Sequence, residues 1–187
     1  MSDKDRIKSV TPLRIWTIGH STRTAREFEE LVRAHHIKAI VDVRTYPTSR
    51  RFPHFNQKQL SEQLAQSGIG YLHIPSLGGM RKPLAKSKNT AWRNASFRGY
   101  ADHMETESFA NGISELLGVA ASSPTAFMCA ESVWWKCHRS LIADHLKSKG
   151  NEVIHILSID KTEVHPYTSA ARIVDGELSY AGLLPEE

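Results

Sequence analysis

The chain alternates between short apolar runs of strand length and longer stretches in which apolar residues recur at helical spacing. Residues 14–18 form a β-prone run. After a Gly-His-Ser turn, Thr24 and Glu27 have the spacing of a capping box that opens a helix running to about residue 36. Residues 38–43 then form a nearly continuous apolar strand. This β-α-β unit predicts two parallel strands joined by a right-handed crossover.

The same alternation continues along the chain and is interrupted once, by a long loop over residues 75–98. Loops of this length in a compact domain are usually functional or disordered. The further elements predicted are helices over 56–66, 109–121 and 137–149 and strands over 71–74, 125–130 and 152–158. We therefore predict a single α/β domain with a mostly parallel five-stranded sheet and helices on both faces. The domain spans residues 14–158, after a flexible lead-in over 1–13 and before an irregular C-terminal extension over 159–187.

Composition narrows the setting of the protein. A chain of 187 residues is long enough to bury a core of its own. It carries only two cysteines and no N-terminal signal segment, which favours a reducing compartment and a cytoplasmic protein. No apolar run approaches the roughly 20 residues needed to cross a bilayer, so we expect no membrane partner.

Charge is unevenly distributed. Between Asp42 and Asp102 the chain has ten basic residues and one acidic residue, Glu62, a local charge of +9 that leaves −5 for the remainder. Such a segment attracts phosphates and other anions, although solvated loops have the same composition. Aromatic residues between the charges resemble surfaces that stack bases. They are Tyr46, Phe52, Phe55, Trp92, Phe97 and Tyr100. Nucleic acid or a phosphate-bearing small molecule is the partner that this pattern favours.

Several short motifs together resemble one family. They are Thr17-Ile18-Gly19-His20-Ser21, Asp42-Val43-Arg44 with Pro47 and Ser49, the Leu77-Gly78-Gly79 loop, and Cys129-Ala130-Glu131 followed by Cys137-His138-Arg139. In this order they resemble the family known as domain of unknown function 488, over roughly residues 14–158. The resemblance implies an α/β fold and a shared polar site, and it implies no settled activity.

These motifs follow the predicted strands at their carboxyl ends. In an open parallel sheet, ligands bind in the crevice beyond those ends. Residues of these motifs follow four strands there: His20 and Ser21 after the first, Asp42 and Arg44 after the second, Gly78 and Gly79 after the third, and Glu131 after the fourth. We therefore expect the motifs to meet at one edge of the sheet and form a site.

Each candidate residue has a chemical role and a structural alternative. Asp42 and Glu131 are candidates for acid-base catalysis. Arg44 and Arg139 are candidate anion clamps, and the anion-binding set also takes in Ser21, Gly78, Gly79 and Lys82. A helix cap at His20 or an ion pair between Asp42 and either arginine would explain the same residues structurally.

The cysteines offer a further reaction. Cys137 precedes a predicted helix, whose N-terminus lowers a thiol pKa, so it is a candidate nucleophile with His20 or His138 as base. Cys129 lies inside an apolar strand and is predicted to be a small buried hydrophobe. The C-x7-C spacing matches no usual zinc pattern, so no metal site is predicted.

Three functions therefore remain open: an enzyme acting on a nucleotide or nucleic acid, a nucleic-acid-binding module without catalysis, and thiol-dependent chemistry at Cys137. The sequence identifies no cofactor and leaves open whether the protein is an enzyme.

Overall fold

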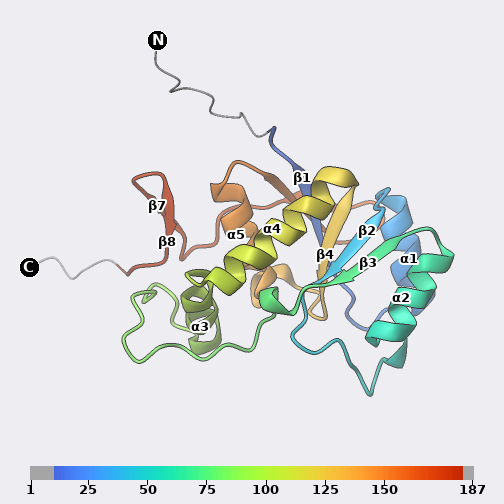
Figure 1. Cartoon of the computed structure of the whole chain (residues 1–187), viewed down its shortest axis with the longest axis horizontal. Helices are drawn as coiled ribbons and strands as arrows, with labels where there is room; N and C mark the ends of the chain where they lie inside the picture. Colours follow the sequence, from blue (N-terminus) through green and yellow to red (C-terminus); the bar gives the residue numbers. More distant parts are fainter. Residues whose placement is uncertain (1–10, 183–187) are drawn as a thin grey trace, which may run out of the picture.

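The computed structural model describes residues 11–182 and places a twisted sheet between two layers of helices (Figure 1). The sheet has six strands in the order β3-β2-β4-β1-β5-β6. Strands β1 to β5 are parallel, and β6 pairs with β5 in the antiparallel direction. The strands are β1 (Arg14–Gly19), β2 (Ala39–Asp42), β3 (Gly70–His73), β4 (Thr125–Cys129), β5 (Glu152–Ile156) and β6 (Thr162–Val164).

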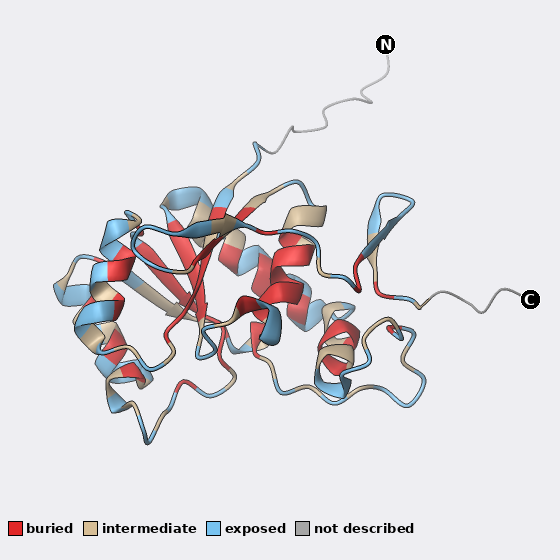
Figure 2. Ribbon diagram, turned by 180° about the vertical axis from the view of Figure 1, so that it is seen from behind, coloured by how far each residue is buried: buried red, intermediate tan, exposed pale blue. Residues whose placement is uncertain are grey.

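The helices cover both faces of the sheet because each presents one apolar side to it. Helices α1 (Ala25–Ala34) and α2 (Gln57–Gln66) pack on one face, where Phe28 and Leu60 are fully buried. Helices α3 (Ala95–Met104), α4 (Glu107–Ser122) and α5 (Arg139–Ser148) pack on the other. Figure 2 shows the buried residues concentrated in the strands and on the inner sides of the helices.

The predicted fold class is confirmed, with one more strand than expected. The capping box at α1 is also confirmed: the backbone N–H of Glu27 donates to the Thr24 hydroxyl, and the backbone N–H of Thr24 donates to the Glu27 carboxylate. Helix α3 was not predicted and lies at the end of the expected loop. Three short 3-10 turns, Pro53–Phe55, Pro75–Leu77 and Trp134–Lys136, complete the described elements up to residue 158.

The structure differs from the expected irregular extension after residue 158. Strand β6 joins the sheet, and β7 (Arg172–Val174) and β8 (Glu177–Ser179) form a separate hairpin. Its turn residues Asp175 and Gly176 have φ values of 50° and 83°, as a two-residue hairpin turn requires. Of the expected flexible lead-in, residues 1–10 lie outside the described part of the chain. None of the helices between residues 11 and 182 has the length and apolar content to cross a membrane.

The strand order creates a crevice at one place in the sheet. The chain leaves β1 toward α1 on one face, but it leaves the neighbouring strand β4 toward α5 on the other face. Where adjacent strands send their connections to opposite faces, the loops diverge and leave space beyond the strand ends. The predicted site residues after β1, β2 and β4 border this point.

Candidate functional site

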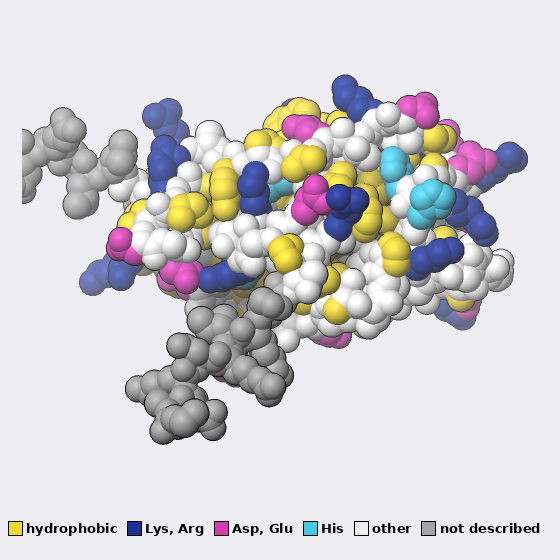
Figure 3. Space-filling view, turned by 90° about the horizontal axis from the view of Figure 1, so that it is seen from above, with side chains coloured by type: hydrophobic (Ala, Val, Ile, Leu, Met, Phe, Trp, Pro, Cys, Tyr) yellow, Lys and Arg dark blue, Asp and Glu magenta, His cyan; other side chains and the backbone are white. Residues whose placement is uncertain are grey.

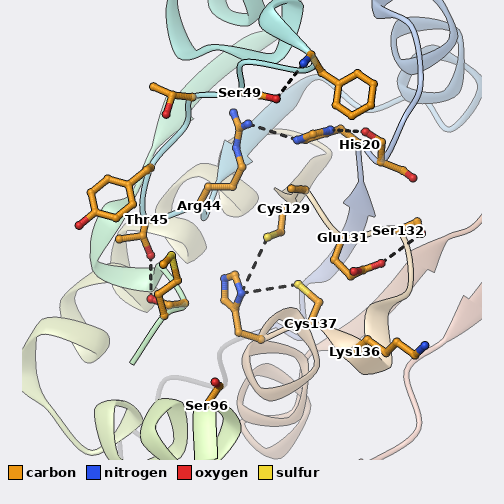
Figure 4. A pocket seen from close by; sticks show the side chains of 18 of the residues that line it. His20, Arg44, Thr45, Ser49, Ser96, Cys129, Glu131, Ser132, Lys136 and Cys137 are labelled. Atoms are coloured by element: carbon orange, nitrogen blue, oxygen red, sulfur yellow. Dashed lines mark hydrogen bonds between the residues drawn. The ribbon is translucent and has the colours of Figure 1, made fainter. Parts of the chain in front are cut away.

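A cavity of about 610 Å³ lies at the carboxyl ends of β1, β2 and β4. The loops after β1 and β4 are held side by side there, because the backbone N–H groups of His20 and Ser21 donate to the carbonyls of Cys129 and Ala130 at 3.0 and 2.9 Å. The cavity is within the size range of small-molecule sites. Its lining includes His20, Arg44, Cys129, Cys137 and His138 (Figure 4).

Two cysteines and one histidine meet in this cavity. The Nδ1 atom of His138 is 3.7 Å from Cys137 Sγ and 4.0 Å from Cys129 Sγ, and the three atoms lie within 4.8 Å of one another. In Figure 4, dashed lines run from both cysteine sulfurs to the same imidazole ring. Strand β4 ends at Cys129 and α5 begins two residues after Cys137. The loop between these two elements returns to the strand end, so Cys137 and His138 lie next to Cys129. Cys137 is buried and Cys129 is partly exposed.

The imidazole of His138 is held in one orientation. Its Nε2 donates to the backbone carbonyl of Val43 at 3.0 Å, and because a carbonyl can only accept, Nε2 carries a proton. Nδ1 is therefore the nitrogen available to take a proton from a sulfur. A Cβ atom on Gly79 would lie 2.9 Å from Nδ1, so the absence of a side chain at Gly79 makes room for the ring. This close approach explains a glycine that the sequence analysis assigned to anion binding.

The two sulfurs differ in acidity. The pKa of Cys137 is well below its ordinary value, chiefly because the Cys129 thiol donates a hydrogen bond to it, with further contributions from His138 and Arg139. The pKa of Cys129 is well above its ordinary value, chiefly through the same hydrogen bond and through burial. The pair thus shares one negative charge, which resides on Cys137. A thiolate at this position is the form of cysteine that reacts as a nucleophile.

Arg139 supplies a positive charge beside this thiolate. Its side chain is 1% exposed, and it donates to the Thr17 hydroxyl at 2.8 Å and to the Glu131 carbonyl. All of these partners are neutral, and no carboxylate of residues 11–182 forms a salt bridge with Arg139. A buried guanidinium without a countercharge is strongly unfavourable. Arg139 is one of the groups that lower the Cys137 pKa, so a thiolate at Cys137 would supply that countercharge.

A second buried cluster lies next to the cavity and is already neutralised. Arg44 forms hydrogen bonds from two of its nitrogens to the fully buried Asp42, which also accepts from the Tyr71 hydroxyl at 2.7 Å. Another nitrogen of Arg44 lies 3.3 Å from Nε2 of His20. The Nδ1 atom of His20 donates to the Ser21 carbonyl, and burial lowers the His20 pKa to about 4. Both His20 nitrogens are therefore occupied, which leaves His138 as the base for Cys137.

The remaining predicted residues divide between the cavity and its surroundings. Ser21, Gly79 and Glu131 line the cavity, as do His20, Arg44 and Cys137, whereas Asp42, Gly78, Lys82 and Arg139 do not. The Glu131 carboxylate is exposed and accepts the backbone N–H of Val133 at 3.1 Å. A Cβ atom on Gly78 would meet the Thr45 backbone, so close packing explains this glycine. Asp42 and Arg139 thus support the site from behind instead of contacting a ligand.

The sequence placed Cys129 in the core and suggested four aromatic residues of the cavity wall only for base stacking, and it did not single out Met80 or Lys136. Side chains with apolar surface form much of that wall: Tyr46, Phe52, Met80, Phe97 and Tyr100. Lys136, on the loop before α5, also lines it. The position of Cys129 as the last residue of its strand was the available signal, because the strand end is where the crevice lies.

The cluster of Cys129, Cys137 and His138 is also the group of described residues that could hold a metal ion. Sulfur and nitrogen ligands of a tetrahedral zinc ion lie roughly 3.6 Å apart, close to the 3.7 and 4.0 Å observed. The spacing argument against a metal therefore does not exclude this site, because the fold brings the ligands together. Charge favours a metal-free thiolate at Cys137 over a zinc site. Two thiolates bound to a zinc ion would neutralise that ion and leave Arg139 without a countercharge.

Comparisons with known proteins identify a family and no activity. The sequence model described as "Domain of unknown function DUF488" matches residues 24–146, a segment that contains the cysteine-histidine cluster and the paired Asp42 and Arg44. No curated protein and no solved structure matches the chain.

Proposed function

The chain belongs to the family described as domain of unknown function DUF488, and we propose that it is a cysteine-dependent enzyme acting on a small electrophilic substrate. Cys137 is the nucleophile, His138 is the acid-base group, and Arg139 stabilises the thiolate. One observation carries this proposal: the hydrogen bond from His138 Nε2 to the Val43 carbonyl turns Nδ1 toward Cys137 Sγ at 3.7 Å.

This arrangement determines the proposed proton transfers. The Cys137 thiol transfers its proton to His138 Nδ1, and the positive ring stabilises the thiolate together with Arg139. The thiolate attacks the electrophilic atom of the substrate and forms a covalent bond with it. His138 then returns the proton to the leaving group. Nucleophile, base and an orienting carbonyl thus form one hydrogen-bonded series, as nucleophilic catalysis requires.

The cavity supports a small substrate with an apolar part. Cys137 is 5% exposed and lines the cavity, so its sulfur is more accessible to a small molecule than to a folded partner. Phe52, Phe97 and Met80 offer apolar surface, and the charged side chains of Glu131 and Lys136 line the same space.

A nucleic-acid partner has weaker support. Of the aromatic residues between Asp42 and Asp102, Phe55 and Tyr100 are buried in the core, whereas Tyr46 is 69% exposed. Arg44 is paired with Asp42. Figure 3 shows the opposite end of the molecule, at the amino ends of the strands, where lysine and arginine side chains lie among acidic and apolar ones. That face offers no continuous basic track of the kind that a nucleic-acid backbone requires.

The pH dependence of alkylation tests the proposal. An ordinary cysteine has a pKa near 8.5, so its reaction with iodoacetamide declines steadily below that pH. We expect modification of Cys137, located by peptide mass mapping, to persist at substantially lower pH. The shape of the profile is informative even though burial slows the absolute rate. A midpoint at or above that of free cysteine would refute the nucleophile.

His138→Asn tests the base. We expect the alkylation midpoint of Cys137 to move upward, because asparagine cannot hold the proton. His54→Asn is a matched control, since His54 also donates from Nε2 to a backbone carbonyl, that of Arg23, but does not line the cavity. An identical shift in both variants would indicate a general effect on the fold and would count against His138 as the base.

A further inference from the structure

We infer that the electrophile is the sulfur of a low-molecular-weight disulfide and that Cys129 is the resolving thiol, so that one reaction cycle reduces the substrate and joins Cys129 to Cys137. This inference rests on the proposed nucleophile and names its substrate class. It starts from the observation that two thiols, not one, contact His138 Nδ1 inside the cavity.

The second thiol needs a role. Acyl transfer or hydrolysis at Cys137 requires one sulfur and a base; in either reaction Cys129 would lower the Cys137 pKa but would form no bond. The two sulfurs lie within 4.8 Å of each other, and both line the same cavity. A disulfide has a sulfur–sulfur distance of about 2.05 Å, so rotation of the side chains and a small movement of the loop over residues 130–138 bring them into bonding distance. Exchange with a disulfide uses both sulfurs, and the substrate itself is the oxidant.

The reaction balances in two exchanges. In the first exchange, the Cys137 thiolate attacks one sulfur of the substrate, R–S–S–R. A bond forms between Cys137 and that sulfur, the S–S bond of the substrate breaks, and the departing RS⁻ takes the proton from His138. In the second, Cys129 transfers its proton to His138 Nδ1 and attacks Cys137 Sγ. The Cys129–Cys137 disulfide forms, and the second RS⁻ takes that proton. The protein dithiol is oxidised by two electrons and the substrate is reduced to two thiols; a dithiol reductant restores the resting enzyme.

The electrostatics of the pair order these two steps. Before the first exchange, the charge on Cys137 keeps Cys129 protonated. Once Cys137 is bound to the substrate, that charge is gone. This removes the largest cause of the raised Cys129 pKa; burial still raises it, and the Arg139 guanidinium and the backbone N–H of Glu131 still lower it. Consumption of the first nucleophile therefore activates the second.

The size of the substrate follows from the burial of the attacking sulfur. Cys137 is reached through a cavity of about 610 Å³, which admits a small disulfide and excludes one held within a folded protein. We therefore expect reaction with small aromatic or aliphatic disulfides and none with a protein disulfide.

Single-turnover reaction with dithiodipyridine tests the inference. The reduced, full-length protein is mixed with excess reagent, and the release of thiopyridone is followed by absorbance. The mass of the protein product is then measured by intact mass spectrometry. We expect two thiopyridones per chain, no retained adduct, and a mass lower by two hydrogens. Cys129→Ser should release one thiopyridone and retain one adduct on Cys137. Cys137→Ser should react far more slowly than either.

The outcomes separate the inference from the proposed function. A wild-type protein that releases one thiopyridone and keeps the adduct on Cys137 would overturn the resolving role of Cys129 and leave the nucleophile intact. A wild-type protein no more reactive than Cys137→Ser would overturn both. Because the mass of the wild-type product decides the question by itself, the test does not depend on how well Cys129→Ser folds.

Discussion

Replacing Cys129 by alanine measures how much of the acidity of Cys137 comes from the neighbouring thiol. The S–H group of Cys129 donates to the thiolate, and this hydrogen bond is the largest cause of the lowered Cys137 pKa. Hydrogen bonds to charged groups contribute about 1.5–3 kcal/mol. Sulfur is a weak donor, so we take the lower end. This corresponds to a rise of about one unit in the Cys137 pKa, since one unit is about 1.4 kcal/mol.

The rate profile should change in two opposite ways. Well below the midpoint, the thiolate fraction of Cys129→Ala falls about 10-fold for one unit of pKa. The more basic thiolate is intrinsically more nucleophilic by a factor of about 3, given a Brønsted coefficient of 0.4–0.5. Alkylation by iodoacetamide should therefore be about 3-fold slower than wild type at low pH and about 3-fold faster on the high-pH plateau.

This crossing of the two profiles is the informative result, because partial unfolding of the variant would raise the rate at every pH. Cys129→Ser retains a donor and should give an intermediate midpoint. Coincident midpoints for wild type and Cys129→Ala would refute the hydrogen-bonded thiol–thiolate pair.

Three other predictions follow from the geometry around the cluster. Gly79→Ala places a Cβ 2.9 Å from His138 Nδ1, so we expect Cys137 alkylation near pH 6 to fall roughly 10-fold. Gly118→Ala is the control, because its Cβ meets nothing within 4 Å, and it should leave the rate unchanged. Equal alkylation rates in the two variants would contradict the steric role of Gly79. Burial lowers the His20 pKa in the folded protein to about 4, against 6.5 in the unfolded chain. Between pH 6.5 and pH 4 only the unfolded chain binds a proton at His20, so the free energy of unfolding should fall by on the order of 3 kcal/mol as the pH is lowered through this range. Urea titrations should show a shallower loss for His20→Asn, and parallel losses would contradict this assignment. Treatment with a chelator should leave the alkylation rate of Cys137 unchanged, whereas an increase would reveal a bound metal.

The parallel core of the fold could be predicted from the sequence because local signals and tertiary packing agree there. The capping box of Thr24 and Glu27 forms as its spacing indicates, and the apolar runs become the buried strands β1, β2, β4 and β5. Helix α3 was missed because Gly99 lowers its helix propensity. The glycine is required there by packing, since a Cβ would meet the Lys82 backbone at 2.5 Å. The N-cap Asn94, which accepts from two backbone N–H groups, was the available signal.

The hairpin near the C-terminus was missed for a different reason. Strands β7 and β8 have three residues each, too few for an alternating pattern to be visible. The Asp175-Gly176 pair between them is nevertheless a recognised two-residue turn.

The candidate site could be located from the sequence but not resolved into roles. Strand ends can be predicted from the apolar runs, so the edge of the sheet that carries the polar residues could be expected. The direction of each side chain depends on pairing between distant strands. Asp42 accepts from Tyr71 on the adjacent strand β3, and this contact keeps its carboxylate out of the cavity. Cys129 looked like a core residue because it continues an apolar run, and only the position of α5 brings Cys137 and His138 against it.

The two buried arginines beside the cavity show why the reactive charge belongs to sulfur. Arg44 and Arg139 are 6% and 1% exposed, so each needs a nearby negative charge. Arg44 has the Asp42 carboxylate, whereas Arg139 has only a hydroxyl and backbone carbonyls as hydrogen-bond partners. A protonated Cys137 would leave the more deeply buried arginine without a countercharge. The buried charge of Arg139 therefore favours the thiolate form of Cys137 on which the proposed function rests.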